Sequence, residues 1–158
     1  MSLLNYLNIP NLVIPSDFVY TNVFYKGKTI SGYTSYTIDD HRILSQLHSV
    51  FPDFLMSSLE GIFIQEINHR FNQQVHVDPR FIAINYVIES GGDVETFFPE
   101  DNESYKVIPH TWHWLYTNRP HAVRNVSGVR RAITMSIKNK PSDECLDWLI
   151  SNIDLAVS

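Results

Sequence analysis

Apolar and polar residues alternate over much of this chain, and the alternation is densest in its second half. Alternation with a period of two, interrupted by Gly, Pro, Asn and Asp, is the pattern of short strands. Between residues 81 and 138 it predicts a series of strands with turns at regular intervals. Their ranges are 81–88, 94–98, 105–108, 112–117, 121–126 and 130–137. Strands spaced this evenly are typical of a small antiparallel sandwich or barrel.

The first half of the chain contains shorter strand-like runs. In residues 61–68, Ile62 and Ile64 fall on one face of an extended chain, and Phe63 and Gln65 fall on the other. Further upstream, apolar and aromatic residues form short runs bounded by turn residues. These runs are 12–14, 18–20, 23–25 and 33–38. Their composition favours strands, but it does not determine which strands pair.

A helix is predicted at about residues 40–51. Ile43 and Leu47 recur at helical spacing, Asp39 is the expected N-cap, and Pro52 ends the pattern. Because the apolar residues form a stripe along one side, this helix is expected to flank the strands.

A second helix is predicted at about residues 142–155. Pro141 precedes its first turn, and Cys145 and Leu149 belong to an apolar stripe that is expected to pack on the outside of the strands. No internal repeat, low-complexity segment or linker divides the chain. A single domain over residues 1–158 is therefore the simplest interpretation.

Composition narrows the partners and the compartment. The 158 residues are 44% hydrophobic, which suffices for a core, and the formal net charge is −5. Basic residues do not form a run, so a nucleic-acid partner is not expected. Cys145 is the only cysteine, which fits a reducing compartment. No apolar run reaches the ~20 residues of a membrane helix, and residues 1–15 lack the basic start of a signal peptide, so a cytoplasmic protein is expected. The oligomeric state is left open.

Two potential metal ligands, His76 and Asp78, stand one residue apart. In an extended strand, residues i and i+2 project from the same face, so the imidazole and the carboxylate would point into one cavity. One more imidazole would complete a set of two histidines and one carboxylate, which binds Fe(II) on one face and leaves other positions open. The triplet alone is a weak signal, and the third ligand must come from elsewhere in the chain.

His121 is the best candidate for that third ligand. It follows the turn sequence Asn118-Arg119-Pro120 and begins a strand, which places it at the mouth of a sheet. Arg130 follows nine residues later. In a hairpin that turns at Ser127-Gly128, Arg130 would pair near the middle of the His121 strand, and its guanidinium would suit a carboxylate. Arg131 is the alternative if the strand is shifted by one, because only one of the two can face inward.

Polar residues inside the aromatic and apolar strands raise further questions. Asn85 needs a hydrogen-bond partner if it is buried, either in a structural network or on a bound ligand. Trp112-His113-Trp114 fits an aromatic core strand better than a stacking platform or a fourth ligand. Six other basic side chains are interpreted as solvated, although the last four would line a substrate entrance if they faced it. They are His41, His48, His69, Arg70, Arg119 and Arg124.

Taken in order, these residues resemble the Fe(II)- and 2-oxoglutarate-dependent dioxygenases, and most of all their prolyl-hydroxylase-like branch. His76-Val77-Asp78-Pro79-Arg80, the strand that follows and the Gly-Gly turn are similar to the first half of that branch's pattern. Pro120-His121-Ala122-Val123, followed by Arg130-Arg131-Ala132-Ile133-Thr134, is similar to its second half. Residues 121–127 also resemble the distal motif of aspartyl/asparaginyl β-hydroxylases. The resemblance covers about residues 60–138.

The resemblance implies a double-stranded β-helix (jelly-roll) core with iron held by His76, Asp78 and His121. It implies that 2-oxoglutarate binds the iron and pairs its distal carboxylate with Arg130. Dioxygen and a small-molecule, peptide or protein substrate would be the other reactants, with succinate and a hydroxylated product. Asn85 would replace the tyrosine often placed beside the distal carboxylate, or Tyr86 would take this place if the register differs by one.

The sequence departs from the branch after its first two ligands. Only Pro79 separates Asp78 from Arg80, where the branch often has a longer loop that closes over substrate, so the substrate is not determined. The competing hypothesis is a cupin-like or degenerate non-catalytic binding module on the same fold. Cupins usually carry a richer His/Glu ligand set and a more glycine-heavy motif, and this chain has neither. The sequence therefore favours an oxygenase.

Overall fold

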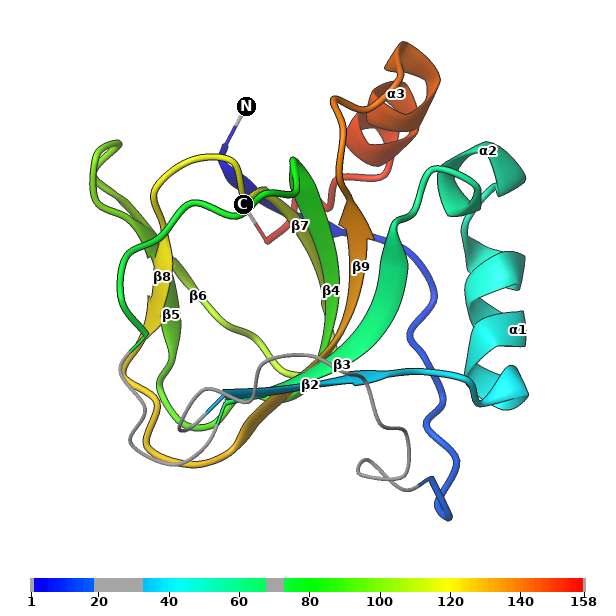
Figure 1. Ribbon diagram of the computed structural model, residues 1–158, viewed down its shortest axis with the longest axis horizontal. Coiled ribbons are helices and arrows are strands. Elements are labelled where there is room, and N and C mark those ends of the chain that lie inside the picture. Colours follow the sequence, from blue (N-terminus) through cyan, green and yellow to red (C-terminus); the bar gives the residue numbers. More distant parts are fainter. Residues whose placement is uncertain (1, 19–32, 68–72, 158) are drawn as a thin grey trace.

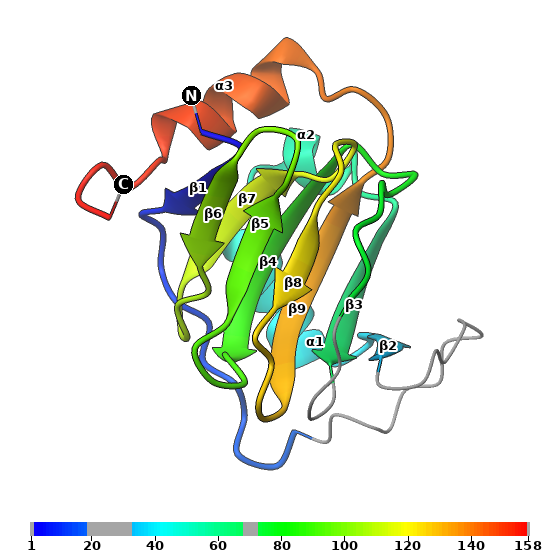
Figure 2. The same ribbon diagram turned by 90° about the vertical axis from the view of Figure 1, so that its left-hand side faces the viewer.

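Two antiparallel β-sheets face each other in the structure, a computed structural model that describes residues 2–18, 33–67 and 73–157. Across the larger sheet lie β1 (Leu4–Leu7), β7 (Trp112–Tyr116), β4 (Ile82–Glu89), β9 (Arg130–Ile137), β3 (Gly61–Ile67) and β2 (Tyr33–Thr37). Across the smaller sheet lie β6 (Glu103–Lys106), β5 (Glu95–Phe98) and β8 (Ala122–Arg124). Figure 1 shows the two sheets as walls of an open sandwich, and Figure 2 shows the smaller sheet in front of the larger. The expected mainly β jelly-roll fold is confirmed, and it is not a closed barrel.

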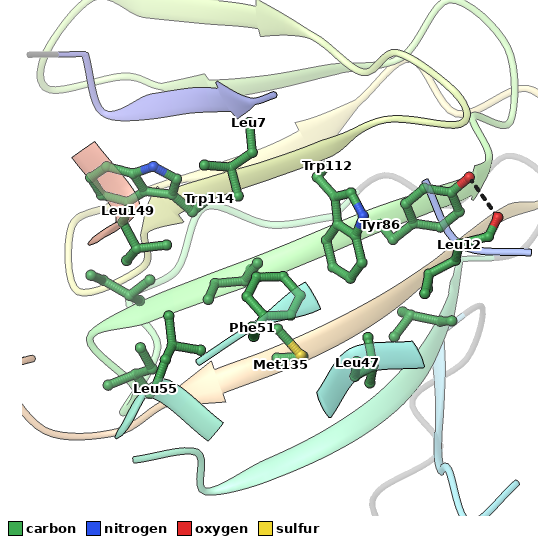
Figure 3. Packing of buried hydrophobic residues seen from close by; sticks show 14 of the residues in the cluster. Leu7, Leu12, Leu47, Phe51, Leu55, Tyr86, Trp112, Trp114, Met135 and Leu149 are labelled. Carbon is green, nitrogen blue, oxygen red and sulfur yellow. Dashed lines mark hydrogen bonds between the residues drawn. The ribbon is translucent and has the colours of Figure 1, made fainter. Parts of the chain in front are cut away.

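Helices cover the outer face of the larger sheet (Figure 1). They are α1 (His41–Val50), α2 (Asp53–Met56) and α3 (Asp143–Ser151). Phe51, just after α1, packs its ring against Trp112 of β7 and Trp148 of α3, at centroid distances of 5.0 and 5.3 Å. Figure 3 shows Phe51 and Trp112 among the residues of this core. Fully burying one such side chain contributes about 1.5–3 kcal/mol, so this face anchors the sandwich.

The inner face of the larger sheet is where polar residues collect. On β4, Ile84 and Tyr86 belong to the core under the helices, whereas Ala83 and Asn85 line a pocket between the sheets. The period of two along each strand explains this division. The predicted parity of residues 61–67 is confirmed in the same way, since Ile64 faces the helices and Gln65 lines the pocket.

The expected hairpin between the His121 strand and the Arg130 strand is wrong. β8 pairs with β5 in the smaller sheet, and β9 pairs with β3 and β4 in the larger one. The connection crosses from one sheet to the other, and the Gly91 carbonyl holds it there by accepting hydrogen bonds from the N–H groups of Ser127 and Gly128, at 2.9 and 2.8 Å. His121 and Arg130 therefore reach the pocket from opposite sheets.

Several predicted boundaries also change. Residues 12–14 form no strand, because Pro10 and Pro15 flank them and proline offers no N–H to a sheet. Asp40, not Asp39, is the N-cap of α1, and its side chain accepts a hydrogen bond from the Arg42 N–H.

Other elements differ in extent or were not predicted. β6 begins two residues before the expected 105–108, α3 ends at Ser151 rather than 155, and β1 and the one-turn helix α2 were not predicted. The runs 19–20 and 23–25 lie outside the described residues. No helix among the described residues is long and apolar enough to cross a membrane.

Candidate metal centre and pocket

The three sequence-predicted ligands come together at one wall of the pocket. One ligand atom from each of His76, Asp78 and His121 lies within 4.8 Å of the others. The backbone brings them together, because His76 and His121 form an antiparallel bridge in which each N–H donates to the other's carbonyl at 3.0 Å. The Asp78 N–H donates to the Thr117 carbonyl at 2.9 Å and extends this pairing. The cluster is therefore fixed by main-chain hydrogen bonds.

Both imidazole rings are oriented by their second nitrogen. His76 Nδ1 lies 2.8 Å from the Gln74 carbonyl oxygen, and His121 Nδ1 lies 2.7 Å from that of Arg119. A carbonyl only accepts, so each Nδ1 carries a proton and donates it. Each Nε2 then faces Asp78, at 3.1 Å from Oδ1 for His76 and 3.7 Å from Oδ2 for His121. This is how histidine ligands are commonly held in metal sites.

Arg80 holds the other side of the Asp78 carboxylate. Its Nε donates to Asp78 Oδ2 at 2.8 Å, and its Nη1 donates to the Ser136 hydroxyl at 2.9 Å. Burial opposes ionisation of Asp78, but the hydrogen bond with His76 and the charge of Arg80 outweigh it and lower its pKa to about 2. The carboxylate is therefore charged at neutral pH, and its Oδ1 is the oxygen that contacts His76.

The pKa values of the two histidines are shifted in opposite directions. The hydrogen bond with Asp78 raises the pKa of His76 above its usual 6.5. Burial is the main cause that lowers the pKa of His121, whose side chain is 6% exposed against 35% for His76. A proton on His76 Nε2 and a cation would therefore compete for the same atom.

The pocket has a volume of about 540 Å³ and contains both candidate ligand-binding polar residues. Arg130 lines it and is 4% exposed. Arg131 does not line it and forms ion pairs with Glu66 at 2.7 Å and with Glu89 at 3.1 Å. Of the two arginines that the sequence left open, Arg130 is the one in the pocket.

Asn85 lines the same pocket and belongs to a hydrogen-bond network. Its Oδ1 accepts from the Thr134 hydroxyl at 2.7 Å, and its Nδ2 lies 3.1 Å from His113 Nε2. Tyr86 points away, with its hydroxyl 3.4 Å from the Leu12 carbonyl oxygen (Figure 3). Trp112 and Trp114 are fully buried in the core, so the interpretation of residues 112–114 as an aromatic core strand is confirmed.

Other predicted and unpredicted residues are now placed. Arg119 pairs with Asp101, and Arg124 pairs with Glu95 and lies over the Phe97 ring; neither lines the pocket. His41 and His48 are exposed on α1, and His69 and Arg70 lie outside the described residues.

Sequence reasoning missed the contacts of Arg80 and of Thr134. The position of each residue in the sequence could have indicated these contacts. Arg80 follows the second ligand after a single proline, and Thr134 shares the face of Arg130 by strand parity.

Comparison with known proteins defines the fold but not the family. No protein-family model matches the chain, and no curated protein matches it. The viral collagen prolyl hydroxylase of Paramecium bursaria Chlorella virus-1, solved with 2OG, is 18% identical over 66% of this chain and 76% of that one, with a TM-score of 0.50. The polyketide cyclase RemF from Streptomyces resistomycificus is 15% identical over 85% and 92%, also with 0.50. A Pseudomonas putida prolyl-4-hydroxylase is 13% identical over 69% and 89%, with 0.44. The chain thus has a jelly-roll fold that is similar both to a hydroxylase and to a cyclase, so the fold alone does not select the chemistry.

Proposed function

We propose that the chain is an Fe(II)- and 2-oxoglutarate-dependent dioxygenase. It would hydroxylate an amino-acid side chain, free or in a protein, or another small substrate. The observation that carries the proposal is the convergence of His76, Asp78 and His121 in a pocket that also contains the buried Arg130. The rival is a cupin-like or degenerate binding module, because the fold alone does not select the chemistry.

The residues present fit Fe(II). Two imidazole nitrogens and one carboxylate oxygen form the donor set that binds this ion on one face, and both Nε2 atoms point toward the carboxylate. When bound, the ion would supply the activation of dioxygen and the oxidising power. Where His76 Nε2 carries a proton, it would release that proton to bind the ion, since the same atom cannot hold both a proton and a metal. Arg80 would hold Asp78 in place through its hydrogen bond to Oδ2 and leave Oδ1 available to the ion.

Arg130 supports 2-oxoglutarate as the cosubstrate. A guanidinium that is only 4% exposed favours an anionic partner, and its planar fork matches a carboxylate. The pocket volume of about 540 Å³ lies within the usual range for small-ligand sites. The proposed reaction is balanced, because one 2-oxoglutarate, one dioxygen and one substrate C–H give succinate, carbon dioxide and one C–OH.

A binding experiment tests the metal and the cosubstrate together. Mn(II) and N-oxalylglycine, an unreactive 2-oxo acid, are added to the metal-free protein, and thermal unfolding is recorded. Ligand at 100 times its Kd stabilises by about 2.7 kcal/mol, which corresponds to roughly 5–11 °C for a chain of this size. His121→Ala should abolish the shift, whereas His48→Ala, an exposed histidine on α1, should keep it.

The outcomes separate the two functions. No shift in the wild type, or an equal shift in His121→Ala, would contradict the proposed metal site and favour the binding module. If the shift is present, succinate formation that requires Fe(II) and 2-oxoglutarate is measured against a panel of peptides and free amino acids, which would identify the substrate class.

A further inference from the structure

Three polar side chains form a row across neighbouring strands on the inner face of the larger sheet. Asn85 of β4 is directly opposite His113 of β7 and directly opposite Thr134 of β9. Their exposures are 8%, 1% and 1%. A buried polar group destabilises the fold unless it is hydrogen-bonded, so a row of three in the interior calls for a specific role or a complete network.

The hydrogen bonds of the row define one orientation of the Asn85 amide. Thr134 donates its hydroxyl proton to Asn85 Oδ1 at 2.7 Å, and Asn85 Nδ2 lies 3.1 Å from His113 Nε2. An amide NH₂ group only donates, so in this orientation His113 accepts at Nε2 and carries its proton on Nδ1, a buried nitrogen with no hydrogen-bond partner among the described residues. Burial, and then the charge of Arg130, lower the pKa of His113 to about 3. The imidazole is therefore neutral and able to accept at any pH near neutrality.

Asn85 keeps one donor and one acceptor for the pocket. An amide nitrogen has two protons and an amide oxygen has two lone pairs, and the row uses one of each. The remaining N–H belongs to Nδ2, beside His113, and the remaining lone pair belongs to Oδ1, beside Thr134. Asn85 lines the pocket, so a ligand there can use either group. A flipped amide would exchange these two positions, and a ligand carboxylate or oxo group would then meet an acceptor where it needs a donor.

We propose that His113 is a positioning residue for the pocket: it fixes the orientation of the Asn85 amide, so that Asn85 donates an N–H to a 2-oxo acid bound between the metal ligands and Arg130. The inference deepens the proposed function, because the ligand is the one proposed above. His113 itself does not line the pocket, so it acts only through Asn85.

A double-mutant cycle tests this arrangement. The Kd of N-oxalylglycine is measured by calorimetry in the presence of Mn(II) for the wild type, His113→Leu, Asn85→Leu and the double variant. One neutral hydrogen bond corresponds to a loss of affinity of about three- to tenfold, which is expected for each single variant. Because His113 acts through Asn85, the double variant should be no weaker than Asn85→Leu.

Two controls separate positioning from damage to the fold. His113→Gln retains an acceptor and should bind N-oxalylglycine within about twofold of the wild type. The Kd for Mn(II) alone should be the same in all variants, since the metal ligands are untouched, whereas a general loss of structure would weaken both ligands. Additive losses in the double variant, or an unchanged Kd in His113→Leu, would overturn the inference.

The orientation is also measurable without any ligand. In ¹⁵N-labelled free protein, His113 should be a neutral imidazole protonated on Nδ1, and one Asn85 side-chain proton should shift when His113 is replaced by leucine. Protonation on Nε2 would mean that the Asn85 amide has the opposite orientation and would overturn the inference. If the wild type binds no N-oxalylglycine with Mn(II), the proposed function and the ligand named here fail together, and the tautomer still decides the role of His113 in orienting Asn85.

Discussion

Exchanging Arg130 for methionine should remove most of the affinity of the pocket for a 2-oxo acid and leave the fold intact. Arg130 is 4% exposed and lines the pocket. The neighbouring Arg131 is a matched control, because it is the same residue type one position along the strand and forms ion pairs with Glu66 and Glu89 instead. Methionine has a similar length and no charge, so the comparison isolates the guanidinium.

The two variants should differ by at least about fivefold in affinity. Hydrogen bonds to a charged group contribute about 1.5–3 kcal/mol, so Arg130→Met should weaken N-oxalylglycine by about 10- to 150-fold. Arg131→Met should leave that Kd within about twofold. It should instead lower the free energy of unfolding by about 0.2–1 kcal/mol, the usual contribution of partly exposed ion pairs.

The assay is calorimetric titration of N-oxalylglycine into the Mn(II)-loaded variants, with urea unfolding beside it. Arg130→Met should also raise the pKa of His113, because the charge of Arg130 is the second cause that lowers it. Burial is the larger cause, so this pKa should stay below its usual 6.5, as an NMR titration would show. If Arg131→Met loses the affinity while Arg130→Met keeps it, the assignment of Arg130 to the ligand is refuted.

Three further predictions concern stability. Phe51→Ala removes a ring packed between two tryptophans and should lower the free energy of unfolding in urea by about 3–5 kcal/mol. His48→Ala, an exposed control, should change that free energy by no more than about 0.5 kcal/mol. Equal effects of the two variants would contradict the packing described. Asp78 has a pKa lowered from 3.8 to about 2 in the metal-free fold, so its contribution is present above about pH 4 and is lost as the pH falls toward 2. Asp78→Asn should flatten that part of the unfolding profile by roughly 1–2 kcal/mol, and an unchanged slope would argue against the contacts of Asp78. Gly91→Ala should destabilise by at least about 1–2 kcal/mol, because φ is +78° and the added Cβ would lie 3.0 Å from the Arg130 backbone nitrogen; an unaltered Tm would exclude this strain.

Strand parity let the sequence decide much of the local arrangement. Alternation along β4 and β9 limited the inward residues to Asn85 or Tyr86 and to Arg130 or Arg131, since a shift of one residue reverses every side chain. Two of the three helices on the outer face, α1 and α3, followed from helical spacing, and the types of the three candidate ligands were visible in the sequence. Periodicity depends only on neighbours along the chain, which is why these features could be predicted.

Tertiary structure alone decided which strands meet. The sequence of β8, the turn and β9 is compatible with a hairpin, yet the two strands belong to different sheets. The turn between them is hydrogen-bonded to the Gly91 carbonyl. Several contacts of the site join residues from separate segments. They are the bridge between His76 and His121, the hydrogen bond of Arg80 to Ser136, and the row through Asn85. Such contacts depend on sheet order and register, which are set by packing of the whole sandwich rather than by local propensity. The sequence by itself therefore determined the residue types and the faces they occupy, and the packed fold decided their distances.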